Sequence, residues 1–295
     1  MDVIKMYRAV EQMRDYIWIF NLNYGRQDLY IYACILPFVN EICDIGLSDT
    51  LYWENSGIDF KVLYNQMDDI KRAVDDMDIV YIYDKINCEI RWFVKAVFEV
   101  LFEKSANELR CLFWSENKEA LQQRYPEILK KIEEFDNEGN KLCIRDYGLR
   151  GNVIYRKKNN IEYDLYTAYS PGEVGAYTML NSELKRYNKI YMWGFNGGYE
   201  VSGGCFVSRD KKIELEIYVT DLIEFKHILL NIPRKGMLLN PDVKWEFNIC
   251  IEDFLKNIDL QKKKESFIYV TECVDDSLIA LEKFIRKHSL NSNLG

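Results

Sequence analysis

The chain is poor in the side chains that most often bind metals or transfer protons near neutral pH. It has two histidines among 295 residues, His227 and His288, and none of its eight cysteines forms a C-x-x-C pair. Zinc sites are usually built from such residues at short spacing. The sequence therefore predicts no metal site, and no catalytic residue is assigned from it.

An excess of positive charge and a long apolar run are also missing. The formal net charge is −8, and an acidic surface repels phosphate backbones, so we expect no nucleic-acid partner. No run reaches the roughly 20 apolar residues of a membrane helix, and the N-terminal segment is charged throughout, unlike a signal peptide. We therefore expect a cytoplasmic protein with reduced cysteines and no membrane partner.

What the sequence does contain is ample hydrophobic material, 48% of the chain, in patterns that change along its length. Residues 1–112 show the three-and-four spacing of amphipathic helices, with a break near Asp84. This pattern predicts a helical N-terminal domain, which could supply a surface for a protein partner or for self-association. Residues 113–168 predict linker helices, with starts at Ser115 and Pro126, followed by a small β-hairpin.

Residues 169–295 alternate between strands and helices. The expected strands are 189–194, 213–220, 244–251 and 266–271, and the expected helices are 170–186, a short one after 198, 222–231, 252–258 and 276–288. Such alternation predicts a parallel sheet with crossover helices. The predicted fold is therefore α/β: a helical N-terminal domain, a small β-hairpin, and a Rossmann-like (methyltransferase-like), mostly parallel sheet.

The segment "KIYMWGFNGGYE" places a glycine-rich loop at the end of the first of these strands. Gly194, Gly197 and Gly198 permit positive φ and allow a phosphate or nucleoside to approach the backbone. Asn196 stands in for the middle glycine of G-x-G-x-x-G, because asparagine tolerates the left-handed region, and Tyr199 could stack on a ligand. The alternative explanation is a close strand–helix contact that involves no ligand.

Acidic residues end the next two strands. Asp221 lies about twenty residues beyond the loop, where a carboxylate accepts hydrogen bonds from ribose hydroxyls. Glu252 and Asp253 occupy the place where an acidic residue often faces adenine in methyltransferase-like sheets. Each has a simpler alternative role as the N-cap of the helix that follows it.

Three segments resemble a known family. "WSENKEALQQRYPEILKKIEE" resembles an aromatic-x-x-N-x-x-A-L…Y-P motif at Trp114, Asn117, Ala120, Leu121, Tyr125 and Pro126. "YDLYTAYSPGEVGAY" is similar to a hairpin followed by S-x-x-P-x-x-E-A, with Pro171, Glu173 and Ala176 at altered spacing. "YMWGFNGGYE" resembles G-F-G-L-G-Y. Over residues 113–260 the chain is thus similar to the N-terminal region of the motility accessory factor family of bacterial glycosyltransferases.

That resemblance implies a Rossmann-like module in bacterial protein glycosylation. The family's sialyltransferase-like domain carries a G-P-S-L segment, which this sequence lacks. The implied function is therefore an accessory or interaction module that binds a nucleotide without catalysis. The alternative is an S-adenosylmethionine-dependent methyltransferase, with the methionine moiety at Gly194–Gly198, the ribose at Asp221 and the adenine at Glu252 or Asp253. A nucleotide sensor without chemistry is a third possibility.

Overall fold

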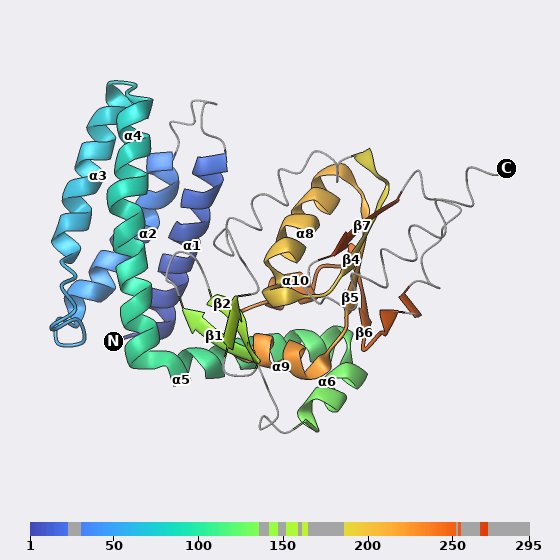
Figure 1. The fold of residues 1–295 in the computed structure, drawn as a ribbon. Helices are drawn as coiled ribbons and strands as arrows, with labels where there is room; N and C mark the ends of the chain where they lie inside the picture. The colour runs from blue at the N-terminus through green and yellow to red at the C-terminus, as the bar shows by residue number, and fades with distance from the viewer. Residues whose placement is uncertain are drawn as a thin grey trace. The chain divides into compact units, whose positions relative to one another are not determined.

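A computed structural model of the protein describes residues 1–22, 31–135, 142–146, 152–158, 161–164, 186–251, 253–254 and 266–270. The chain divides into two compact units, one of residues 1–112 and 145–152 and the other of residues 113–144 and 153–295. The segment 113–168, grouped as a linker from the sequence, is divided between these units. Figure 1 shows the elements of each unit.

The first unit is helical, as its apolar spacing predicts. Its elements are α1 (Val3–Leu22), α2 (Ile31–Ser48), α3 (Phe60–Asp75), α4 (Ile79–Lys85), a π-helical turn (Ile86–Ile90) and the first part of α5 (Arg91–Arg124). Helix α2 packs against both α1 and α3. Met6, Val10, Met13 and Ile17 of α1 are buried, and this spacing places them on one side of the helix.

Helix α2 is long and apolar enough to cross a membrane by length and composition alone. Its buried residues include Ile31, Ile35, Val39 and Ile42, which recur every three or four positions. That spacing is typical of a helix with one face in a protein core. A helix with one face in a protein core passes the same test of length and composition, so this test alone does not indicate a membrane span.

The turn between α3 and α4 lies at Asp76–Asp78, where the sequence predicted no break, and the helix also changes near Asp84, where a break was expected. Asp78 caps α4 by accepting a hydrogen bond from the Tyr81 N–H at 3.0 Å. Met77 adopts a positive φ of 55°, which lets the chain reverse. Asp84 lies in the last turn of α4, which ends at Lys85 and continues as the π-helical turn Ile86–Ile90.

The helix start expected at Ser115 is wrong, because Ser115 is an interior residue of α5. The irregular position of α5 is instead Ser105, with φ −133° and ψ 26°. Its hydroxyl oxygen lies 2.8 Å from that of Tyr52, within hydrogen-bond distance. A tertiary hydrogen bond, rather than a local cap, thus accompanies the irregularity. The start at Pro126 is confirmed by α6 (Pro126–Glu133).

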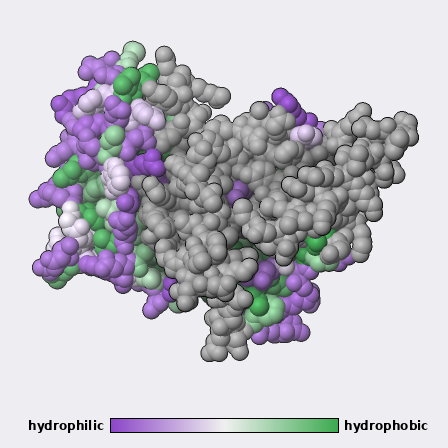
Figure 2. Space-filling model, viewed as in Figure 1, coloured by the Kyte–Doolittle hydropathy of each residue, from purple (hydrophilic) through white to green (hydrophobic). Residues whose placement is uncertain are grey.

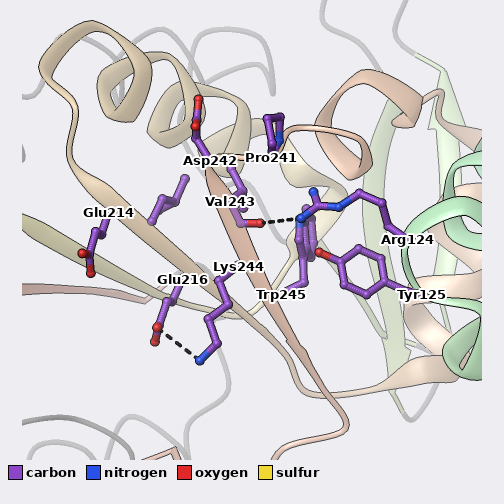
Figure 3. Close-up of a pocket in the computed structure, with 10 residues that line it drawn as sticks. Arg124, Tyr125, Glu214, Glu216, Pro241, Asp242, Val243, Lys244 and Trp245 are labelled. Atoms are coloured by element: carbon purple, nitrogen blue, oxygen red, sulfur yellow. Dashed lines mark hydrogen bonds and ion pairs between the residues drawn. The ribbon is translucent and has the colours of Figure 1, made fainter.

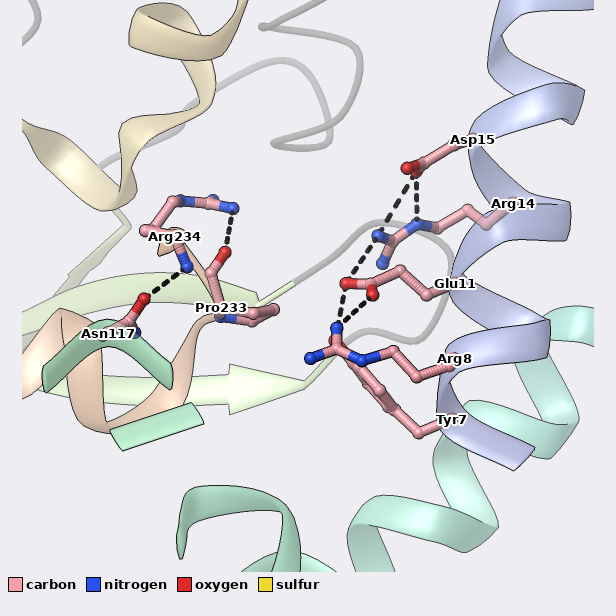
Figure 4. A network of polar contacts seen from close by, with 8 residues as sticks. All are labelled: Tyr7, Arg8, Glu11, Arg14, Asp15, Asn117, Pro233 and Arg234. Atoms are coloured by element: carbon pink, nitrogen blue, oxygen red, sulfur yellow. Dashed lines mark hydrogen bonds and ion pairs between the residues drawn. The ribbon is translucent and has the colours of Figure 1, made fainter. Parts of the chain in front are cut away.

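On the face shown in Figure 2, the described residues of the helical unit are mainly hydrophilic, with hydrophobic residues in separate patches. Several charged residues pair within one helix. On α1, Glu11 lies 2.7 Å from the Arg8 guanidinium and 3.8 Å from that of Arg14 (Figure 4). Pairs of this kind on one helix face contribute only a few tenths of a kcal/mol each, about 0.2–0.5 kcal/mol.

The second unit is built on a four-stranded sheet in which every neighbouring pair is parallel. Its strands are β4 (Lys189–Trp193), β5 (Glu214–Val219), β6 (Val243–Phe247) and β7 (Ser266–Val270), in the order β6-β5-β4-β7. The helices between them include α8 (Tyr199–Lys211), α9 (Leu222–Asn231) and α10 (Lys235–Leu238). An α/β arrangement with a parallel sheet is thereby confirmed.

The third expected strand is shorter than predicted. Strand β6 ends at Phe247, because Asn248 adopts a positive φ of 55°. The Asn248 N–H still donates to the Val219 carbonyl at 2.8 Å, which keeps this end of β6 beside β5.

A separate small sheet has the order β1-β2-β3, with strands β1 (Leu142–Asp146), β2 (Asn152–Lys158) and β3 (Ile161–Asp164). Strands β2 and β3 pair antiparallel, with Lys158 opposite Ile161, so the expected hairpin is confirmed. The helices expected over 170–186 and 276–288, and most of that over 252–258, lie outside the described residues.

Alternation along the strands gives the parallel sheet two different faces. One face is apolar and packs in a core with residues of α8, α9 and α6. Its buried members include Met192, Leu215, Ile217 and Trp245. The other face carries charged side chains near the amino ends of the strands and a buried aromatic cluster, Tyr191, Trp193, Tyr218 and Phe254, farther along.

Candidate functional site

The glycine loop lies at a reversal in the order of the strands. From β4 the chain adds β5 and then β6 on one side, and it returns to add β7 on the other side of β4. Trp193, the last residue of β4, is paired with Tyr218 of β5 and Val270 of β7, so the three strands end at nearly the same level. Open parallel sheets bind ligands at their carboxyl edge, beside such a reversal.

The loop has the backbone that its glycines predict. Gly194 has a φ of 92°, and Gly197 and Gly198 each have a φ of 81°. The Gly194 N–H donates to the Tyr218 carbonyl at 2.9 Å, and a 3-10 turn over Asn196–Gly198 then leads into α8. Residues with a Cβ are strained at these angles, so the turn requires glycine at all three positions.

Close packing also explains part of the glycine pattern. A Cβ on Gly198 would lie 2.8 Å from the Phe195 ring and 2.9 Å from the Nε of Arg234, so protein side chains fill the space beside it. In α8, a Cβ on Gly204 would lie 2.7 Å from the sulfur of Met192, which indicates that glycine lets α8 approach β4. The close neighbours of Gly198 are thus side chains of the loop and of Arg234, whereas a close strand–helix contact occurs at Gly204, where it was not foreseen.

The two other residues predicted to contact a ligand at the loop are Asn196 and Tyr199. Asn196 lies in the 3-10 turn, and its side chain is outside the described part of the structure. The half-buried ring of Tyr199 has the Arg234 guanidinium 4.6 Å from its centre. The protein itself thus supplies a cationic neighbour to the ring that was expected to stack on a ligand.

Asp221 follows β5 at the same edge of the sheet and caps α9. Its Oδ1 accepts hydrogen bonds from the N–H groups of Ile223 at 2.7 Å and Glu224 at 3.0 Å. The N-cap alternative is confirmed, while the ribose contact stays a prediction. Glu252 lies outside the described residues. Asp253 is exposed, and its Oδ2 accepts a hydrogen bond from the Cys250 thiol at 3.2 Å.

Arg234 joins this edge and was missed from the sequence. Its Nε donates to the Gly197 carbonyl at 2.8 Å, and its Nη1 donates to the Pro233 carbonyl at 3.0 Å. Its Nη2 is buried and has no hydrogen-bond partner among the residues that the structure describes. Arginine is always protonated in proteins, so the loop carries a fixed positive charge with donor capacity left. The only sign of this residue in the sequence was the basic pair Arg234-Lys235 directly after Pro233.

The opposite edge of the sheet holds a hollow of about 490 Å³ at the start of β5 and β6 (Figure 3). Arg124, Glu216, Lys244 and Trp245 are among its lining residues. Arg124 donates to the carbonyls of α10 and the segment that follows it, and its Nη2 reaches the Val243 carbonyl at 3.4 Å. The Arg124 guanidinium in this hollow is therefore already hydrogen-bonded to main-chain carbonyls of the protein.

The Glu216 carboxylate in the same hollow is also hydrogen-bonded to groups of the protein. Glu216 accepts hydrogen bonds from Lys189 at 2.9 Å, Lys244 at 3.3 Å and the Tyr218 hydroxyl at 2.8 Å. Burial alone would raise the pKa of Glu216, but these hydrogen bonds outweigh it and hold the pKa below its usual range. Burial and the Glu216 carboxylate both raise the pKa of Tyr218. Together these groups form a satisfied network that stabilises the fold.

No family model, curated protein or solved structure matches this chain. The resemblance to motility accessory factors therefore rests on the short motifs alone, and the function must be argued from the geometry of the glycine-loop edge.

Proposed function

We propose that the second unit is a Rossmann-like module that binds a phosphate-bearing nucleotide at the Gly194–Gly198 loop without catalysing a reaction. The observation that carries the proposal is Arg234, whose guanidinium contacts this loop beside the reversal in strand order. Numbered along the chain, the order β6-β5-β4-β7 reads 3-2-1-4, which matches the first four strands of the 3-2-1-4-5-6 order of a doubly wound dinucleotide-binding sheet. The glycine loop follows the first strand, where such sheets bind phosphate.

Arg234 favours a phosphate over the sulfonium of S-adenosylmethionine. A sulfonium bound in the loop would lie near a guanidinium of the same sign, and at an effective dielectric of about 20 two like charges 4 Å apart repel by roughly 4 kcal/mol. A phosphate oxygen would instead accept the hydrogen bond that the buried Nη2 lacks among the described residues. The methyltransferase remains the alternative, and the same experiment tests it.

The N-terminus of α8 contributes less than Arg234 to the binding of a phosphate. Glu200, in the first turn of α8, is 6% exposed, and a buried acid there competes with a bound anion for the helix N-terminus. A helix dipole contributes about 0.3–1 kcal/mol, whereas a hydrogen bond to a charged group contributes about 1.5–3 kcal/mol. We therefore assign phosphate recognition to Arg234.

The biological role proposed with this site is that of a cytoplasmic accessory protein in bacterial protein glycosylation. It follows from the resemblance to motility accessory factors, with the helical unit as the surface for a protein partner or a second copy. His227 lies within α9, not at the carboxyl edge of the sheet, so it gives no reason to assign a catalytic base.

The test is thermal unfolding and calorimetric titration of the full chain with four nucleoside diphosphates, the matching nucleosides, S-adenosylmethionine and S-adenosylhomocysteine. A ligand at 100 times its dissociation constant should stabilise the fold by about 2.7 kcal/mol. We expect at least one diphosphate to bind more tightly than its nucleoside. Binding of S-adenosylmethionine alone would favour the methyltransferase, and binding of none would refute the proposal.

A further inference from the structure

Asn117, in the part of α5 that belongs to the second unit, is a buried polar residue with an exposed fraction of 0%. Its Nδ2 donates to the carbonyls of Leu229 at 2.7 Å and Ile232 at 2.8 Å, and its Oδ1 accepts from the Arg234 N–H at 2.7 Å. An asparagine amide has two donor hydrogens, and both are used here. The orientation of the amide is unambiguous, because the carbonyls need donors and the N–H needs an acceptor.

These three hydrogen bonds fix the main chain between the end of α9 and Arg234, whose side chain contacts the glycine loop. Leu229 is in the last turn of α9, and Ile232 leaves the helix with an extended φ of −137°. Two residues later, the Arg234 main chain is fixed by Asn117 (Figure 4). The side chain of Arg234 continues from that point to the Gly197 carbonyl at 2.8 Å.

We propose that Asn117 is a positioning residue for phosphate recognition, an inference that rests on the proposed function. It fixes the main chain of Arg234, so that the guanidinium lies against Gly197 with Nη2 directed to the nucleotide phosphate. Loss of the Asn117 bonds frees the main chain at Arg234, and the guanidinium then loses its fixed distance to the loop. Affinity for the phosphate falls, while contacts with the nucleoside part are retained.

Arg124 offers a matched control on the same helix. It also binds main-chain carbonyls of the segment after α9, at Leu238, Asn240 and Val243. Those contacts lie at the far end of the segment, at the amino edge of the sheet. Arg124→Met therefore disturbs the anchoring of this segment by α5 without touching the residue that faces the loop.

The experiment uses the tightest-binding nucleoside diphosphate and its nucleoside, titrated into the full chain. The quantity compared is the ratio of the two dissociation constants in the original protein and in Asn117→Asp, Arg234→Gln, the double variant and Arg124→Met. Asn117→Asp keeps an acceptor for the Arg234 N–H but loses both donors. We expect it to lower the diphosphate preference by roughly tenfold, the scale of a charge-assisted hydrogen bond.

The double variant separates positioning from general destabilisation. If Asn117 acts through Arg234, adding Asn117→Asp to Arg234→Gln changes the preference no further, and Arg124→Met leaves it unchanged. An unchanged preference in Asn117→Asp, or full additivity in the double variant, overturns the inference while nucleotide binding stands. If Asn117→Asp does not fold, Asn117→Ser gives the same comparison. If the original protein binds no diphosphate, the proposed function itself is wrong.

Discussion

The two edges of the parallel sheet carry similar side chains, but they use them differently. At the amino edge, Arg124 and Glu216 line a hollow of about 490 Å³, and each is bound to groups of the protein itself. At the carboxyl edge, Arg234 contacts the glycine loop and keeps a buried Nη2 without an acceptor in the described part of the chain. Unused hydrogen-bond capacity, rather than empty volume, therefore marks the candidate site.

The largest expected effect comes from adding a methyl group at the carboxyl edge. Gly198→Ala combines backbone strain at a φ of 81° with contacts of 2.8 Å to Phe195 and 2.9 Å to Arg234. We expect a loss of about 2–4 kcal/mol in the free energy of unfolding, together with weaker diphosphate binding because Arg234 must shift. Denaturant unfolding and calorimetric titration measure the two effects.

Gly57→Ala is the control for the backbone term. Gly57 has a φ of 73°, and nothing lies within 4 Å of an added Cβ. Only the strain term applies there, about 1 kcal/mol, and diphosphate affinity should not change. Equal losses of stability in the two variants would show that the Gly198 corner is not tightly packed.

At the amino edge, Glu216→Gln should change stability but not binding. It removes the closer of the two carboxylates beside the Lys189 ammonium, which is 25% exposed, and leaves it only Glu214 at 3.5 Å among the described carboxylates, so we expect a loss of about 2 kcal/mol in the free energy of unfolding. Lys244, whose side chain is 60% exposed, is the matched control, since Lys244→Gln removes its ion pairs with Glu216 and Glu246, and pairs of an exposed ammonium contribute less than about 1 kcal/mol each. Weaker diphosphate binding in Glu216→Gln would contradict the assignment of separate roles to the two edges.

The lowered pKa of Glu216 also predicts how the stability of the protein depends on pH. Because the pKa of Glu216 is lower in the folded protein, its stabilising contribution is present above the unfolded glutamate pKa of about 4.3 and is lost as pH falls through the folded pKa. The stability difference between the original protein and Glu216→Gln should therefore shrink below about pH 4. Urea unfolding at several pH values measures this stability difference. A difference that grows at low pH would contradict a lowered pKa of Glu216 in the folded protein.

The smallest effect concerns Asp221, which separates the cap from the ribose contact. Asp221→Ala should cost about 1 kcal/mol through loss of the bonds to Ile223 and Glu224. Asp221→Ser keeps a capping hydroxyl and should restore most of this stability. If the carboxylate also contacts ribose, Asp221→Ser weakens binding of nucleosides and nucleotides alike, whereas unchanged binding would leave Asp221 as a cap alone.

Much of the sheet was predictable because its signals are local. Strand β5 reads as a stretch with apolar residues at alternate positions, Leu215, Ile217 and Val219, and α9 begins after a capping aspartate, so their predicted limits differ from the structure by a residue or less at each end. The positive φ of Gly194, Gly197 and Gly198 followed from residue type and place in the chain. Local sequence could not decide whether Asp221 caps a helix, binds ribose or does both, because all these roles require a carboxylate there.

The rest depends on contacts between distant residues. The Arg234–Gly197 bond joins positions 37 residues apart, and the Arg234–Asn117 bond joins positions 117 residues apart, so neither leaves a periodic pattern. Ser115 resembles a helix start, yet α5 runs through it to Arg124 and contributes Asn117 to the segment that carries Arg234. Tertiary packing overrides the local signal there.

The central claim, that Arg234 recognises a phosphate, is tested most directly by titrating one nucleoside diphosphate and its nucleoside into the original protein, Arg234→Gln and Lys235→Gln. Lys235 is the neighbouring cation, already paired with Glu119 at 2.7 Å, and serves as the control. We predict that Arg234→Gln removes roughly a tenfold or greater preference for the diphosphate, while nucleoside affinity and the Lys235→Gln protein are nearly unchanged. An equal preference in all three proteins would contradict the account.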